Sequence, residues 1–141
     1  MLRVQRLTDT AKLPRRATSG SAGYDLCSVE NFELAARARV LIATGITISI
    51  PEDCYARIAP RSSLAVKGID VLAGVIDSDY QNEVKVILIN HGELPFTIQC
   101  GDRIAQLILE KIHAVPVFDV VNDTPVQEGF EVRKGGFGST N

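Results

Sequence analysis

One aspartate near the start of the chain lies in the sequence AGYDL at residues 22–26. An aspartate after a glycine is common in turns, because its side chain bonds to nearby backbone amides. Asp25 could instead lie beside a metal–phosphate complex, since Mg²⁺ prefers oxygen ligands and keeps several waters, so that one protein carboxylate can suffice. Both interpretations stay open on this segment alone.

An arginine and two serines open the sequence PRSSLAVKG at residues 60–68. A serine can cap the start of a helix and a glycine suits the left-handed residue after its end, so we predict one short helix over 63–67. Arg61, Ser62 and Ser63 would then place a guanidinium and two hydroxyls beside unpaired backbone amides. The segment is either a simple capped turn or an anion site.

A run of polar residues, DSDYQNE at 77–83, separates two apolar stretches. This pattern predicts a hairpin over 74–85, with Asn82 in the left-handed conformation that such turns require. Asp77 directly follows the first apolar stretch, where a partly desolvated carboxylate could accept a proton from water. Tyr80 has an apolar body that could pack on a sugar or a base. A surface turn with scattered charges is the alternative.

Two later segments complete the set. In GDRIAQLI at 101–108, Gln106 is either an exposed residue or a specific hydrogen-bond donor, and we expect Arg103 to form an ion pair with a nearby carboxylate. The tail RKGGFGST at 133–140 combines cationic and hydroxyl side chains with glycines, which let backbone amides approach phosphate oxygens. Its phenylalanine could stack on a base. The tail lacks the spacing of a P-loop, and a disordered terminus is the alternative.

The elements that must position these residues are short strands. The chain has 14 valines and 13 isoleucines, whose branched side chains favour strands, and glycine and proline recur at short intervals. We predict a strand plus loop over 2–18 and strands over 45–50, 54–58, 71–76, 84–89, 96–99, 103–111 and 115–121. Short strands with frequent turn signals predict an all-β sandwich, barrel or jelly roll.

Size and charge exclude several classes of protein. A length of 141 residues indicates a single domain, which we divide into a β core over 1–121 and a mobile C-terminal arm over 122–141. A net charge of −2 argues against broad binding to nucleic acid, and the apolar runs are too short to span a membrane. The three cysteines are odd in number and widely spaced, and the first residues lack a secretory signal, so we expect an intracellular protein, cytoplasmic or nuclear.

Taken together and in order, the five segments closely resemble the five motifs of the trimeric deoxyuridine triphosphatases (dUTPases). The stretches ATSGSAGYDL and GVIDSDYQ are the most diagnostic. The resemblance implies a distorted jelly roll with one short helix, assembled as a homotrimer with active sites at the subunit interfaces. The tail of one chain would close over a site formed by the other two. The reaction would convert dUTP and water to dUMP and pyrophosphate with Mg²⁺, supplying the thymidylate precursor and limiting uracil in DNA.

The resemblance also implies a role for individual residues. Asp77 would be the general base for the attacking water, and Asp25 would hold the waters of Mg²⁺. The phosphate ligands would be Arg61, Ser62, Ser63 and Gln106. The base would be read by the main chain at Gly74 and Lys85, the deoxyribose would pack on Tyr80 and the uracil on Phe137. The lid over the phosphates would consist of Arg133, Gly138, Ser139 and Thr140.

Three positions depart from the family pattern. Asn82 and Asn141 stand where the family usually has glycine, and only Lys134 separates Arg133 from the two glycines, where two residues are common. Either Arg133 or Lys134 could therefore take the role of the tail arginine. Two other functions stay open on the sequence: a dCTP deaminase, which shares this fold, and a non-catalytic binding module of the same fold.

Overall fold

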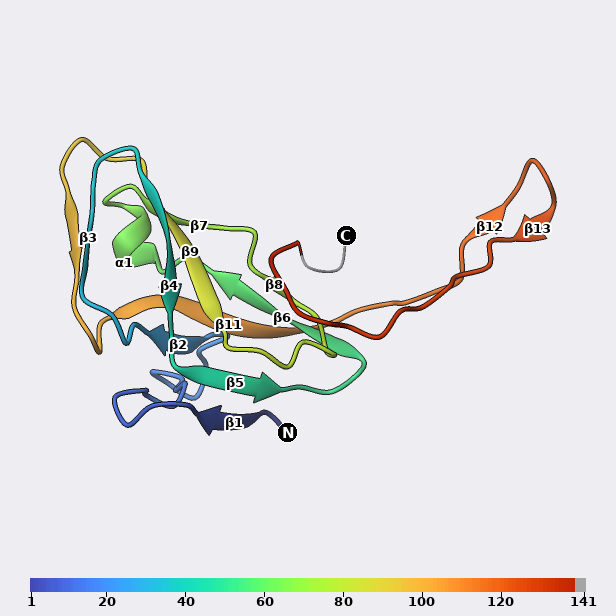
Figure 1. The fold of residues 1–141 in the computed structure, drawn as a ribbon, viewed down its shortest axis with the longest axis horizontal. Helices are drawn as coiled ribbons and strands as arrows, with labels where there is room; N and C mark the ends of the chain where they lie inside the picture. Colours follow the sequence, from blue (N-terminus) through green and yellow to red (C-terminus); the bar gives the residue numbers. More distant parts are fainter. Residues whose placement is uncertain (139–141) are drawn as a thin grey trace.

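The computed structural model describes residues 1–138, and within this range the chain is all-β with one short helix, as predicted (Figure 1). The helix is α1 (Ser62–Ala65). The strands are β1 (Arg3–Arg6), β2 (Tyr24–Cys27), β3 (Phe32–Leu34), β4 (Arg39–Ala43), β5 (Ile46–Ser49), β6 (Cys54–Ala59), β7 (Ile69–Leu72), β8 (Val75–Ile76), β9 (Lys85–Asn90), β10 (Phe96–Ile98), β11 (Arg103–Lys111), β12 (Phe118–Asp119) and β13 (Thr124–Pro125). No helix in this part of the chain is long and apolar enough to cross a membrane.

Two antiparallel sheets form the body of the fold. One has the strand order β2-β11-β6-β8 and the other the order β4-β9-β7, while β1-β5 and β10-β3 form two-stranded sheets beside them. Buried side chains of both larger sheets join one apolar cluster, in which Leu107 and Ala56 meet the layer that carries Val86 and Leu88. Alternation of buried and half-buried residues along β9 matches a strand with one face on the core. The burial of this cluster therefore fixes the two sheets as facing layers.

The short helix differs from the predicted range 63–67 at both ends and in its N-cap. It begins at Ser62 and ends at Ala65, and Arg61 takes the N-cap position without a side-chain hydrogen bond. The expected serine cap was wrong, because both serines lie inside the first turn and are exposed. Buried Leu64 anchors the helix to the core, and Gly68 has the expected left-handed conformation, with φ +87°.

The chain switches sheets between β7 and β8, which the sequence did not predict. Ala73 and Gly74 have φ values of +58° and +86°, and they interrupt the apolar stretch that we expected to form one strand over 71–76. After this bend Val75–Ile76 pairs with β6, whereas β9 pairs with β7 and β4. The two strands expected to form a hairpin over 74–85 therefore belong to different sheets. Asn82 is not among the residues with positive φ, so its predicted left-handed conformation was wrong.

A long arm leaves the core directly after β11 (Figure 1). The predicted strand over 115–121 shrinks to β12, which pairs with β13 on the arm itself and not with the core. The arm exposes apolar side chains, among them Val120 and Val121, because no strand within residues 1–138 covers them. Residues 133–138 then return to the core, where they meet the loop that follows β8.

Candidate active site

Most of the predicted site residues gather in two clefts that share no lining residue. The first, here called the seam cleft, has a volume of about 220 Å³ and is lined by Ile58, 72–77, Tyr80, Val84, Lys85, Ile87, Arg133, Gly136 and Phe137. The second, here called the arginine cleft, has a volume of about 270 Å³ and is lined by Ala17, 21–23, Asp25, 61–63, Arg103 and Gln106. A single described chain therefore holds the site residues in two separate groups.

The seam cleft opens where the ladder between β7 and β9 ends. The register pairs Ile69 with Asn90 and Leu72 with Ile87, and continuing it would place Gly74 opposite Lys85. The chain has already bent toward β6 at this point, so the two backbones separate and leave a slot between the sheets. The two residues expected to read a base by their main chain thus both line this gap.

Gly74 is held at this bend by the neighbouring strand. Its carbonyl accepts a hydrogen bond of 2.7 Å from the backbone N–H of Ile58. A Cβ atom at this position would lie 2.4 Å from the Ile58 carbonyl oxygen, and the positive φ already disfavours any side chain. The bend that opens the slot therefore requires glycine.

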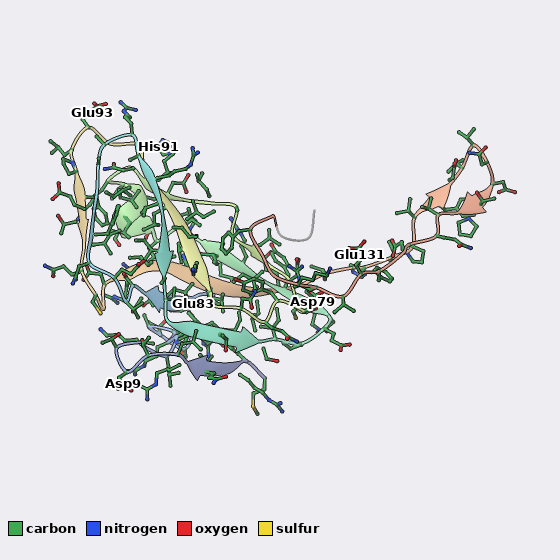
Figure 2. The ribbon with its side chains drawn as sticks, in the orientation of Figure 1. Asp9, Asp79, Glu83, His91, Glu93 and Glu131 are labelled. Atoms are coloured by element: carbon green, nitrogen blue, oxygen red, sulfur yellow. The ribbon has the colours of Figure 1, made fainter. Side chains whose placement is uncertain are left out.

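Asp77 and Asp79 both contact the returning tail. The guanidinium of Arg133 donates to Asp77 through Nη2 and to Asp79 through Nε, the latter at 2.7 Å. Figure 2 places Asp79 where the tail meets the core. The Asp77 side chain is 53% exposed, so its carboxylate stands at the mouth of the seam cleft, within reach of water and of a ligand.

Tyr80 forms one wall of the seam cleft with its ring. Its hydroxyl donates to the backbone carbonyl of Glu83 at 2.7 Å, and burial raises the pKa of the phenol, with the nearby Glu83 carboxylate adding to the rise. The ring is therefore neutral and fixed in orientation. Gly136 of the tail lies so close that a Cβ atom there would stand 2.6 Å from the ring.

The arginine cleft is organised around Asp25. This carboxylate pairs with Nε of Arg61 at 3.3 Å and with Nη1 of Arg103 at 3.5 Å, and its side chain is 22% exposed. The predicted ion pair of Arg103 is confirmed, and its partner is Asp25. Two cations around one carboxylate leave positive charge at the cleft, which suits a polyanion.

Strand registers explain why these residues meet. Gln106 of β11 pairs with Asp25 on one side and with Ala59 on the other. Its side-chain amide donates to the Pro60 carbonyl at 2.9 Å, and the close approach of Gly23 leaves no room for a Cβ atom, which would lie 2.1 Å from the Gln106 oxygen. The register thus brings motifs from three distant segments to one end of the sheet.

The tail residues fall into three groups. Arg133 and Phe137 line the seam cleft, and Phe137 has a φ of +53°. Lys134 is exposed and Gly138 lines neither cleft, so Arg133 is the tail cation that lies at the site. The predicted phosphate contacts of Ser139 and Thr140 lie outside the described residues. Asp79 was not assigned to the site from the sequence. Its position two residues after Asp77 could have indicated that it lies near the same cleft.

The donor set limits how a metal could bind. Within residues 1–138 no group of three or more His, Cys, Asp or Glu side chains could hold a metal ion. A single carboxylate, Asp25, lies in the arginine cleft. This set fits a Mg²⁺ ion that is held mainly by the oxygens of a phosphate ligand and contacts the protein through its waters.

Comparisons with known proteins identify the family that the chain resembles. A family model described as dUTPase matches residues 9–141. The deoxyuridine 5'-triphosphate nucleotidohydrolase of Paramecium bursaria Chlorella virus 1 is 51% identical over 140 residues, which cover 99% of this chain and 96% of the relative. The protein of the same name from Solanum lycopersicum is 49% identical over 139 residues, covering 98% of this chain and 80% of the relative.

Solved structures of dUTPases have the same fold. A dUTPase mutant of Staphylococcus bacteriophage 80alpha with dUpNHpp has a TM-score of 0.81 and 25% identity, covering 100% of this chain and 98% of that one. A mutant dUTPase from phage phi11 of S. aureus, described for its coordination of a structural Mg(II) ion, has a TM-score of 0.81 and 24% identity, covering 85% of this chain and 96% of that one. With a family match over most of its length and relatives near half identity, the chain belongs to the dUTPase family.

Proposed function

We propose that this protein hydrolyses dUTP to dUMP and pyrophosphate by attack of water on the α-phosphorus. The observation that carries the proposal is the slot between Gly74 and Lys85, with the carboxylate of Asp77 at its mouth. The names of the relatives and the dUpNHpp complex of the phage enzyme support it. In the cell such a reaction would supply dUMP for thymidylate synthesis and limit uracil in DNA.

Uracil is selected by hydrogen bonds to the backbone in this proposal. An opened strand pair presents N–H and C=O groups at fixed positions, which match the O4 acceptor and N3–H donor of uracil. Cytosine reverses this donor and acceptor, so a bound cytosine would leave buried polar groups unpaired. The fixed ring of Tyr80 would support the deoxyribose and leave no room for a 2′-hydroxyl, and Phe137 at the rim would stack on the base.

The arginine cleft would bind the triphosphate. Arg61, the exposed hydroxyls of Ser62 and Ser63, and the second amide proton of Gln106 are available donors for phosphate oxygens. Asp25 would hold Mg²⁺ through its waters. The ion, when bound, neutralises phosphate charge and favours departure of pyrophosphate.

Asp77 would act as the general base. Its carboxylate accepts a proton from a water molecule while that water approaches the α-phosphorus, and the tail shields the site from other water. Arg133, Gly138, Ser139 and Thr140 would complete the lid over the phosphates. Positioning and charge neutralisation account for most of the rate in such reactions, which need little covalent chemistry from the protein.

The separation of the two clefts supports a homotrimer with shared sites. A base bound in the seam cleft of one chain would place its phosphates in the arginine cleft of another, at a heterologous interface that closes into a ring. In the described chain the tail lies over its own seam cleft, and in the proposed trimer it would make the same contacts with the seam cleft of a neighbouring chain. The free thiols of Cys27, Cys54 and Cys100 support a reducing, intracellular location.

A substrate panel tests the proposed reaction. With Mg²⁺ present, pyrophosphate release measured for dUTP, dCTP, dTTP and UTP is expected to give a kcat/KM for dUTP about 10⁴ times that for dCTP, because a site built for specific hydrogen bonds rejects a ligand with the reversed pattern. Release of ammonia from dCTP would instead assign a deaminase. Absence of turnover on all four nucleotides would leave the binding module as the function.

Mixing two inactive variants tests the shared sites. Asp77→Asn damages the seam cleft and Arg61→Ala damages the arginine cleft, so each alone is expected to be nearly inactive. After denaturation together and refolding, random trimers should regain about a quarter of the active sites, because each site draws the two clefts from different chains. Light scattering should give the mass of about three chains. A mixture that stays as inactive as its parts would contradict the shared-site model.

A further inference from the structure

The guanidinium of Arg133 donates to three acceptors, two on the loop after β8 and one on the tail itself. Nε donates to Asp79 at 2.7 Å, Nη2 donates to Asp77, and Nη1 donates to the carbonyl of Gly135 at 3.1 Å. The arginine side chain is 20% exposed, whereas the two carboxylates are mostly exposed. Hydrogen bonding to Asp79 is the main cause that raises the pKa of Arg133. The tail is thus attached at the site chiefly through this one side chain.

The two carboxylates differ in what the proposed reaction requires of them. Asp77 must turn toward a water molecule, so its bond to Arg133 has to be given up when substrate binds. Asp79 lines neither cleft and has no part in the chemistry, so its bond to Nε can persist. A guanidinium held through Nε keeps its two Nη groups directed to one side, where they could pass from Asp77 to a phosphate oxygen.

A second contact lies beside this ion pair. Gly136 packs against the ring of Tyr80 so closely that no side chain would fit, and the next residue, Phe137, lines the cleft. Asp79 and Tyr80 are neighbours on the same loop. This loop therefore contacts the tail twice, through the ion pair with Arg133 and through the Tyr80 ring against Gly136. Phe137 thus lines the cleft on a stretch of tail that is held at Arg133 and at Gly136.

We propose that Asp79 is a positioning residue, which seats the tail through Arg133 and keeps Arg133 at the cleft after it has released Asp77. The inference rests on the proposed function and adds a residue to it. Without substrate, Arg133 covers the general base. With substrate, Asp79 holds the arginine while its Nη groups bind phosphate. Loss of Asp79 should weaken tail closure and leave the chemical step of a closed site unchanged.

Tail closure can be measured apart from turnover. The chain has no tryptophan, so Phe137→Trp introduces a single tryptophan at the cleft, whose emission can be excited separately from that of the three tyrosines. Titration with dUpNHpp and Mg²⁺ then reports closure over the bound nucleotide. In this background Asp79→Asn is expected to raise the analogue concentration at half-response by about three- to tenfold, the range expected for a partly exposed charged hydrogen bond. Asp79→Glu should restore most of the response.

Steady-state kinetics distinguish a positioning role from a merely structural one, because a positioning role should change KM and leave kcat nearly the same. Asp79→Asn should raise KM for dUTP by about three- to tenfold with little change in kcat, since the closed site is intact once formed. In an Arg133→Gln background the same substitution should have no further effect, because both act through one contact. The matched control is Glu52→Gln, an exposed acid in the loop between β5 and β6, which should behave as the unaltered chain.

The outcomes separate the inference from the proposed function. If Asp79→Asn changes neither the analogue concentration at half-response nor KM, the inference about Asp79 is overturned while the proposed function stands. The inference would also be overturned if Asp79→Asn raised KM by the same factor in the Arg133→Gln background as in the unaltered chain, because the two residues would then act independently. If the chain with Phe137→Trp as its single change does not respond to dUpNHpp and the unaltered chain does not turn over dUTP, the proposed function fails and the inference fails with it.

Discussion

Replacement of Asp77 by asparagine is expected to lower kcat for dUTP by about 10²–10⁴-fold, the usual contribution of a general base. Asparagine has nearly the same shape but cannot accept a proton from water. Asp77 lies at the mouth of the seam cleft and is absent from the arginine cleft, so an asparagine of nearly the same shape should still allow dUpNHpp to bind. Steady-state pyrophosphate release and a binding isotherm for the analogue, measured on the same sample, check both halves of this expectation.

The nature of the loss distinguishes Asp77 from its neighbour. Asp77→Asn should act on kcat, whereas Asp79→Asn should act on KM, although both carboxylates contact Arg133. Asp53→Asn, on the exposed turn before β6, is a matched control and should leave both constants unchanged. Turnover by Asp77→Asn within about threefold of the unaltered enzyme would show that another group activates the water, since even a modest general base contributes more than that.

Deletion of residues 133–141 is expected to lower kcat/KM for dUTP by about 100-fold or more while the core stays folded. The truncation removes Arg133 and Phe137 from the seam cleft and leaves it open to water. The apolar cluster contains no residue beyond Leu109, so thermal unfolding should occur at nearly the same midpoint. Differential scanning calorimetry and the pyrophosphate assay test the two statements separately.

A scrambled tail is the control for this deletion. A chain that carries the same nine residues in another order keeps the length and charge of the tail but loses the spacing between Arg133, Gly136 and Phe137. It should be as impaired as the truncation. Full activity in either variant would show that the tail does not act as a lid.

The all-β class and the longest strand could be predicted because their signals are local. Branched residues and frequent turn residues favour short strands, and the predicted strand over 103–111 matches β11 residue for residue. By contrast β2, β3 and β4 were not predicted. These strands have three to five residues, and each is held by its pairing with a distant strand, such as β2 with β11. A short segment carries too little local pattern for such pairing to be inferred.

Predictions from the apolar pattern alone were also wrong at the sheet switch over 71–76 and at the arm over 115–121. The stretch over 71–76 is apolar throughout, so nothing in its periodicity indicates that Ala73 and Gly74 bend it from one layer to the other. The valines of 115–121 are typical of a core strand, yet they lie on the arm with no strand of the core beside them. Whether an apolar segment is buried depends on a partner strand, which a single sequence does not name.

The membership of the two clefts was easier to predict than their internal contacts. Asp25, Arg61 and Gln106 were singled out by residue type and by family resemblance, and they do lie together. The pairing of Asp25 with Arg61 follows from the registers of β11 with its two neighbours, and those registers depend on the whole sheet. Asp79 was missed because its partner lies 54 residues away on a tail whose course the sequence does not determine.

The seam cleft has one wall on each of two separate layers, Ile58 and Ile76 on one sheet and Leu72 and Ile87 on the other. Its width is therefore governed by how tightly the layers press together, a distance maintained by interior side chains such as Val86 and Leu88 that no nucleotide ever touches. If the seam cleft binds uracil as proposed, its discrimination between uracil and thymine, which carries an extra methyl group, would depend partly on the packing of the protein's interior. Replacing a core valine with a larger residue would then widen the seam cleft and relax this selectivity before the protein lost its fold.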